Sequence, residues 1–238
     1  MNEKFLLYYA ANKRYFRAAC AVVILAVAIL LFALGSKQTV LRGAYLYGSD
    51  TIDAEAFQPV SRGFVKSLGL NPGNARVRMI GTVVYQVNPE TPGANFDAIE
   101  ALVEYTGKGY LDFLVGDAAI MEDLAYSEFF MDLREVLPQE QLAALEGHLL
   151  YVDQAVIRQL EEMAISQEYP EDFTLPDPAS PQLMAEPVPI FLDVSGNEIL
   201  KSLFPDGAVF FGVAQNTERP ATAREFIKYL LQVEAEME

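Results

Sequence analysis

The sequence predicts an α/β domain with a mixed or mainly parallel sheet, preceded by a single N-terminal transmembrane helix. Two observations predict this fold class. One uncharged, apolar stretch lies near the N-terminus, and beyond residue 36 short β-branched runs alternate with segments of helical periodicity. Strands that alternate with helices favour a layered α/β fold. A chain of 238 residues is long enough for one such domain and an anchor.

The apolar stretch covers residues 18–34 and reads AACAVVILAVAILLFAL, with no charged residue. With its flanking residues it reaches the roughly 20 residues that cross a hydrocarbon core. A buried helix of a soluble domain would show polar residues at helical spacing, whereas this stretch is apolar all round. It therefore predicts a membrane span.

Basic residues flank this span unequally. Those nearest to it are Lys13, Arg14 and Arg17 before it and Lys37 and Arg42 after it. The positive-inside rule then places the N-terminus in the cytoplasm and the larger part of the chain outside. We expect a single-pass protein of a bacterial cell membrane with a cytoplasmic segment (1–17), a transmembrane helix (18–35) and an extracytoplasmic domain (36–238).

The N-terminus has two other possible roles, that of a cleaved signal peptide and that of a lipid attachment site. The segment 33–35 (Ala-Leu-Gly) is an acceptable cleavage site, so a cleaved signal peptide stays open as an alternative, although the apolar stretch is longer than a typical signal core. Cys20 begins the apolar stretch instead of following it, which argues against lipid attachment. As the only cysteine, Cys20 also excludes an internal disulfide.

The net charge and the composition limit the classes of partner that the domain is expected to bind. The net charge is −16, and because residues 1–17 carry +3, the remainder carries −19. A domain this acidic is repelled by phosphate backbones, so no nucleic acid is expected as a partner. Anionic lipid headgroups repel it too, which leaves the basic N-terminal arm as the part suited to them. His148 is the only histidine, so a histidine-based metal site is excluded, and no cofactor is expected.

Six runs predict strands. They are β-branched or apolar and are bounded by glycine, proline or polar turns. They cover 40–47, 77–87, 110–115, 149–152, 188–194 and 208–214.

The segments between these runs predict helices. Pro59 and Pro220 suit first turns, Asn95 and Asp117 suit N-caps, and Gly107 suits a helix end. The helical faces fall within 57–68, 95–107, 117–124, 138–145, 153–164, 197–204 and 220–231. Five prolines within 168–187 predict an irregular loop there.

Two segments resemble bacterial extracellular (periplasmic) solute-binding proteins. In residues 109–145, a strand end reading LDFLVGD leads to a helix, then to Met131-Asp132-Leu133 and Val136-Leu137-Pro138. Residues 208–231 resemble the late strand and helix of that family, and 188–199 resemble a crossover strand with its short helix. The resemblance implies a periplasmic-binding-protein-like (type II) fold. The domain is shorter than a usual two-lobed receptor and has no tryptophan, so sugar binding is not expected.

Ligands of open α/β sheets sit beyond the carboxyl ends of strands. Three predicted strand ends combine a glycine with a short polar side chain. The candidate ligand-binding residues are Gly48, Ser49, Gly116, Asp117, Asp193 and Ser195. The alternative is structural, because such residues also cap helices and form tight turns.

No catalytic motif emerges, so the chain is not expected to be an enzyme. Asp112 and Asp117 lie five residues apart across a strand end and need not face each other, and Glu161-Glu162 fits a solvated helix face. A serine–lysine hydrolase is a further alternative, because residues 76–81 resemble the lysine-bearing strand of signal peptidases. That segment contains no lysine, however, and Lys37 next to Ser36 would lie in the headgroup zone rather than in a desolvated pocket.

We therefore expect a membrane-anchored extracytoplasmic protein that binds a small solute or peptide without catalysis. The first alternative is a degenerate solute-binding fold that acts as an interaction or scaffold module with a membrane protein partner. The weaker alternative is an anchored serine hydrolase.

Overall fold

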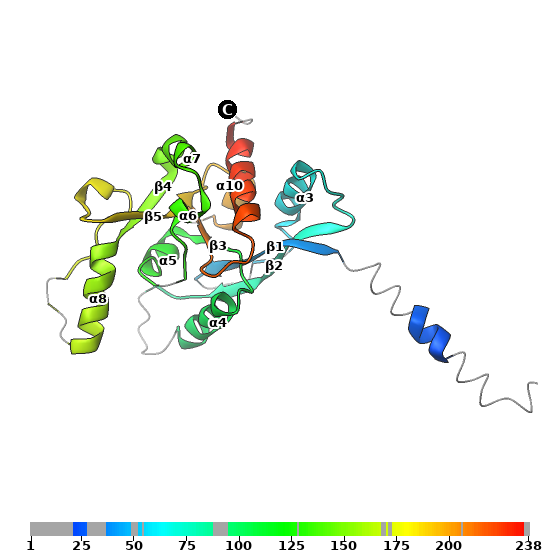
Figure 1. The fold of residues 1–238 in the computed structure, drawn as a ribbon, viewed down its shortest axis with the longest axis horizontal. Coiled ribbons are helices and arrows are strands. Elements are labelled where there is room, and N and C mark those ends of the chain that lie inside the picture. The colour runs from blue at the N-terminus through cyan, green and yellow to red at the C-terminus, as the bar shows by residue number, and fades with distance from the viewer. Residues whose placement is uncertain are drawn as a thin grey trace, which may run out of the picture.

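The structure is a computed structural model, and it describes residues 21–27, 37–48, 52–53, 55–87, 95–127, 129–167, 170, 173–205 and 207–235. A six-stranded mixed sheet forms the centre of the domain (Figure 1). Its strands are β1 (Gln38–Tyr47), β2 (Ala75–Val84), β3 (Phe113–Asp117), β4 (Leu149–Asp153), β5 (Pro187–Asp193) and β6 (Val209–Val213). They lie in the order β2-β1-β3-β6-β5-β4.

Of the two expected arrangements, mixed or mainly parallel, the sheet is mixed. β1 is parallel to β2 and β3, but the pairs β3–β6, β6–β5 and β5–β4 are antiparallel. The reason lies in the connections. After β5 the chain returns to the sheet at the end where it left, and there the Val194 amide donates to the Val209 carbonyl (2.9 Å). Likewise, β4 ends at Asp153, which lies opposite Pro187, the first residue of β5. The segments that contain α8 and α9 therefore leave the sheet and return to it at the same end. Parallel neighbours would require a crossover connection to the opposite end.

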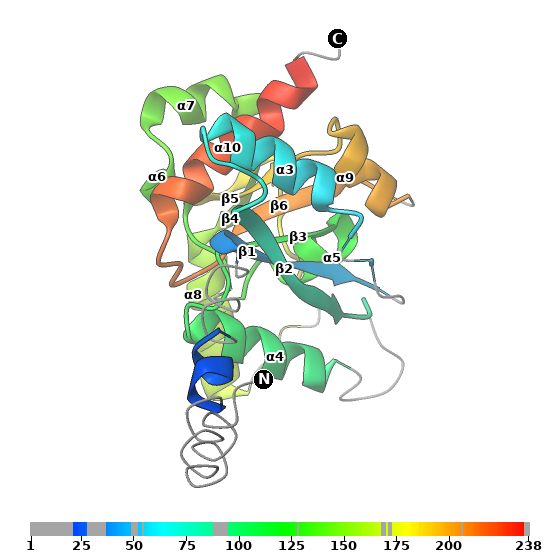
Figure 2. The same ribbon diagram turned by 90° about the vertical axis from the view of Figure 1, so that its right-hand side faces the viewer.

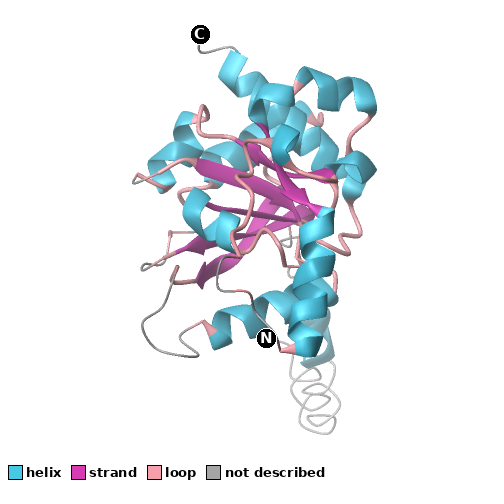
Figure 3. Cartoon of the chain, turned by 90° about the vertical axis from the view of Figure 1, so that its left-hand side faces the viewer, coloured by secondary structure: helices cyan, strands magenta, loops and turns pink. Residues whose placement is uncertain are grey.

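Helices cover both faces of the sheet (Figures 2 and 3). One face packs against α3 (Gln58–Ser67), α6 (Leu133–Val136), α7 (Gln139–Ala144), α9 (Glu198–Leu203) and α10 (Pro220–Ala235). The other packs against α4 (Phe96–Gly107), α5 (Ala118–Asp123) and α8 (Gln154–Ser166). Two short 3₁₀ turns complete the described elements, η1 (Glu146–His148) and η2 (Pro181–Leu183).

The core on the α10 face is rich in aromatic rings. Phe226 of α10 is 1% exposed and lies within 5.0 Å of the Phe113 ring and 4.8 Å of the Phe64 ring, centroid to centroid. Gly43 of β1 makes room for Phe113, since a Cβ at Gly43 would lie 2.2 Å from that ring. The ring packing holds α3 and α10 firmly against β1 and β3.

Both edge strands of the sheet are partly covered. The buried Ser61 hydroxyl of α3 accepts from the Val77 amide of β2 (2.9 Å) and donates to its carbonyl (3.3 Å). At the other edge, the Tyr151 amide of β4 donates to the Pro178 carbonyl in the proline-rich loop (2.9 Å). These contacts satisfy backbone groups that would otherwise be open to another strand.

The predicted elements are confirmed within a few residues at each end, with two differences in detail. Asn95 begins α4 but does not cap it. Its side chain instead accepts from the Gln86 amide (2.8 Å) and donates to the Gln86 carbonyl (2.6 Å). Val103, expected on the inner face of α4, is 56% exposed.

The expected membrane span lies mostly outside the described residues. Of residues 18–35, only 21–27 are described, and they are helical and exposed. Within the described part of the chain, none of the helices combines the length and hydrophobicity that crossing a membrane requires.

Candidate functional site

The three loops predicted to hold a ligand meet at one edge of the sheet. β1 and β3 are parallel, and because both β3 and β5 are antiparallel to β6, the carboxyl ends of β1, β3 and β5 all lie on the same side. This carboxyl edge contains Gly48, Gly116-Asp117 and the Asp193–Ser195 loop. Ser49, which was also predicted, lies outside the described residues. The edge is also where the chain switches from one side of β1 to the other, the usual ligand position in open α/β sheets.

Gly116 and Gly48 of the carboxyl edge differ in how closely a side chain at each position would approach its neighbours. A Cβ on Gly116 would lie 2.8 Å from the Leu46 carbonyl oxygen of β1, so a side chain there would push the two strands apart. A Cβ on Gly48 would meet only ordinary contacts, with the Tyr85 carbonyl at 3.7 Å and Ile120 at 3.8 Å. Gly116 thus has a packing role, whereas Gly48 leaves its backbone approachable.

The polar side chains of the carboxyl edge already have partners within the domain. Asp117 caps α5 by accepting from the Ala119 amide (3.0 Å). Asp193 accepts from the amide and the hydroxyl of Ser195, and that hydroxyl accepts from the Val209 amide (2.9 Å). These hydrogen bonds shape the loop between β5 and β6. The structural reading of these three residues therefore has direct support.

A hollow of about 470 Å³ opens elsewhere, on the α8 face of the sheet; we call it the α8 cleft. Its floor is apolar and includes Val152, Val188 and Ile190 of β4 and β5. One wall is α8, with Gln154, Ile157 and Glu161, and the other is the chain between α5 and α6, with Tyr126, Ser127, Phe130 and Asp132. Gln215 and Asn216, which follow β6, complete the lining.

The α8 cleft has the size of a small-molecule site, since such sites enclose about 300–1,000 Å³. Its lining is more polar than the largely apolar lining that is usual for them. The amides of Gln154, Gln215 and Asn216 can both donate and accept hydrogen bonds. Burial raises the pKa of the Tyr126 hydroxyl, so this phenol stays neutral at physiological pH.

The lining of the α8 cleft is acidic. Its charged members are Asp132, Glu135 and Glu161, and no lysine or arginine is among the described residues that line it. Asp132 is paired with Arg134 (2.6 Å), whereas Glu135 and Glu161 form no ion pair with any described residue. The geometry therefore favours a ligand that carries positive charge.

Asp153 fixes the start of the α8 wall. Its carboxylate accepts from the amides of Ala155, Ala185 and Glu186, at 3.0, 2.7 and 3.0 Å. Burial alone would raise the pKa of this carboxyl, but the three backbone hydrogen bonds outweigh it and hold the pKa below its ordinary value. The ionised Asp153 thereby joins α8 to the chain that enters β5.

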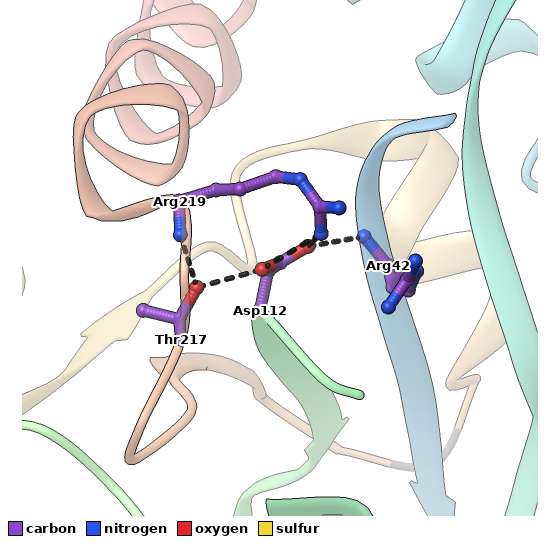
Figure 4. A network of polar contacts seen from close by, with 4 residues as sticks. All are labelled: Arg42, Asp112, Thr217 and Arg219. Atoms are coloured by element: carbon purple, nitrogen blue, oxygen red, sulfur yellow. Dashed lines mark hydrogen bonds and ion pairs between the residues drawn. The ribbon is translucent and has the colours of Figure 1, made fainter. Parts of the chain in front are cut away.

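The most buried charged group of the described chain is Asp112, at the start of β3. It is 0% exposed, and three donors from two other parts of the chain surround it (Figure 4). Its carboxylate accepts from the Arg42 amide (2.7 Å), the Thr217 hydroxyl (2.6 Å) and the Arg219 guanidinium (3.0 Å). Thr217 in turn accepts from the Arg219 amide (3.0 Å).

This arrangement, the Asp112 lock, ties β1, β3 and the start of α10 together. The structure also separates the two carboxylates Asp112 and Asp117. Asp112 directly precedes β3 and Asp117 ends it, so the two carboxylates lie at opposite ends of this strand. Glu161 and Glu162 are exposed on α8, as expected.

The hydrolase alternative gains no support from the described residues. Lys37 is exposed and donates to the Pro72 carbonyl (3.2 Å), so its amine is not desolvated. Ser36 lies outside the described residues. Among the residues described, no group of three histidine, cysteine or acidic side chains is arranged to hold a metal ion.

Sequence reasoning missed the α8 cleft. Gln215 and Asn216 directly follow a predicted strand, but no glycine accompanies them as one does at the three candidate strand ends. Because β6 is antiparallel to β3, they lie at the end of the sheet opposite to those three loops.

No family model matches the chain, and neither the curated proteins nor the solved structures contain a match for it.

Proposed function

We propose that this chain is a membrane-anchored extracytoplasmic binding protein that holds a small solute or short peptide in the α8 cleft. The observation that carries the proposal is the cleft itself, a hollow of about 470 Å³ with an apolar floor and a rim of amides and carboxylates. The resemblance of residues 109–145 and 208–231 to extracellular solute-binding proteins supports a binding role. The anchor follows from the apolar stretch 18–34 and its basic inner flank.

The ligand is a cation or a zwitterion with an apolar part. Glu135 and Glu161 supply negative charge outside the ion pairs of the described residues, and the apolar floor offers surface to aliphatic or aromatic groups. Residues 79–238 carry 29 acidic against seven basic residues, which adds a long-range attraction for cations. In this proposal the ligand is bound and released unchanged.

A second function, that of an interaction module, is favoured by a different observation. The described polar side chains that were predicted there, Asp117, Asp193 and Ser195, are engaged within the domain. Phe96 and Val103 of α4 are 67% and 56% exposed. A degenerate solute-binding fold that docks on a membrane protein through α4 would show both features.

A thermal-shift screen separates the two functions. The 36–238 fragment is mixed with amino acids, amines, short basic peptides and sugars. A ligand at about 100 times its dissociation constant is expected to raise the melting temperature by about 5–10 °C. We expect the hits to be cationic or zwitterionic.

The control uses matched losses of charge. Glu135→Gln with Glu161→Gln should remove most of the shift, whereas Glu140→Gln with Glu146→Gln, on the exposed surface of α7 and η1, should leave it intact. A library without hits would contradict solute binding and favour the interaction module.

A further inference from the structure

Positive charge is concentrated in the first part of the outer domain. Residues 37–78, which form β1, α3 and the beginning of β2, contain six lysines and arginines against three acidic residues. Their net charge is +3, whereas residues 79–238 carry −22. Figure 1 shows β1, β2 and α3 together at the end of the domain opposite α8. The domain is thus strongly dipolar.

Four of these cations line one pocket of about 250 Å³ between α3 and β2, which we call the basic pocket. They are Lys37, Arg62, Arg76 and Arg78, and Glu55 is the one acidic residue of the lining. All four cations are exposed, and none forms an ion pair with a described residue. In a chain with 33 acidic residues, four cations gathered without an ion pair in one place favour an anionic partner from outside.

The pocket lies at the side of the sheet where the anchor joins it. Gln38 of β1 pairs with Ala75 of β2, and Arg42 pairs with Arg78, so these cations lie along the first half of both strands. Lys37 follows the expected span 18–35 by two residues, which an extended chain covers in about 7 Å. The turn from α3 to β2 also exposes an apolar side chain, Leu70, which is 39% exposed.

We propose that the basic pocket binds the phosphate headgroups of anionic phospholipids and holds the outer domain in a fixed orientation on the membrane. Guanidinium groups bind phosphate oxygens through paired hydrogen bonds, and each lysine or arginine near an anionic surface adds attraction. The short tether favours a headgroup over a free phosphate because it keeps Lys37 at headgroup level. The amino ends of β1 and β2 then face the lipid, and Gly48, Gly116 and Asp117 face away from it.

This inference rests on the anchoring part of the proposed function and is independent of ligand binding. The test uses the full chain in nanodiscs made either of phosphatidylcholine alone or of phosphatidylcholine with phosphatidylglycerol. Hydrogen exchange of residues 68–79 is followed by mass spectrometry. We expect slower exchange in the anionic discs, and we expect high salt to abolish the difference.

Variants locate the contact. Arg62→Gln, Arg76→Gln and Arg78→Gln together should shift the docking equilibrium roughly 100-fold, about five-fold for each cation, and remove the protection. The matched control, Arg158→Gln, Lys201→Gln and Lys228→Gln, loses the same charge on α8, α9 and α10 and should keep the protection.

Equal exchange in the two kinds of disc, or equal loss in both triple variants, would overturn the proposal. So would protection by inorganic phosphate in the neutral discs, which would make the pocket a site for a soluble anion. A chain that leaves the discs because its helix has been cleaved would overturn the anchoring as well. A chain that stays in the discs with unchanged exchange contradicts the docking alone.

Discussion

Replacing Asp112 with alanine is expected to lower the free energy of unfolding by about 3–5 kcal/mol, the cost of breaking a buried, hydrogen-bonded ion pair from one side. The carboxylate is fully buried and accepts from Arg42, Thr217 and Arg219. Without it, the guanidinium and the Arg42 amide lose their partner inside the domain. Urea unfolding of the 36–238 fragment, followed by circular dichroism, measures the change.

Glu104→Ala is the matched control. Glu104 also pairs with a cation, Lys108 (2.8 Å), but both side chains are about half exposed. Its loss should cost less than about 1 kcal/mol, as exposed ion pairs do. If the two variants lost equal stability, the Asp112 lock would not hold the start of α10 in the way described.

Replacing Phe226 with alanine should cost about 3–5 kcal/mol, because it removes a buried aromatic side chain and leaves a cavity. Phe226 is 1% exposed, and its ring lies within 6.4 Å of five other rings, measured between centroids. These rings belong to Phe57, Phe64, Phe113, Phe211 and Tyr229. Thermal and urea unfolding of the same fragment measure the loss.

Phe96→Ala provides the comparison, since Phe96 of α4 is 67% exposed. Its truncation should change the stability by no more than about 0.5 kcal/mol, the range of ordinary surface substitutions. A large loss at Phe96 would show that α4 is buried against something outside the described domain. A small loss at Phe226 would contradict the aromatic core.

The elements of the fold were predictable because they depend on local sequence. Pro59 and Pro220 mark helix starts, Asp117 caps α5, and the apolar runs form the strands. The direction of β4 and β6 was not predictable in this way. A helix between two strands looks the same in the sequence whether it crosses the sheet or returns to the edge it left, and α8 and α9 return.

The site was predictable only in part for a related reason. The strand-end rule found loops that the structure brings to one edge, but it could not show that Asp193 and Ser195 bond to each other and to β6. The α8 cleft was not predicted, because Gln215 and Asn216 of its lining follow the antiparallel strand β6 and lie opposite to the predicted loops. The basic pocket was missed because net charge averages over the domain, whereas its cations come from β1, α3 and β2 and gather only in the fold.

The central claim is that a solute binds in the α8 cleft, and methyl NMR tests it most directly. The 36–238 fragment, labelled at its isoleucine methyl groups, is titrated with a ligand from the thermal screen. Ile157 and Ile190 line the cleft, whereas Ile120 lies beside Gly48 at the carboxyl edge. Binding in the cleft predicts saturable shifts of the Ile157 and Ile190 methyl signals with Ile120 unchanged. Shifts of Ile120 alone would contradict the claim and place the ligand at the carboxyl edge.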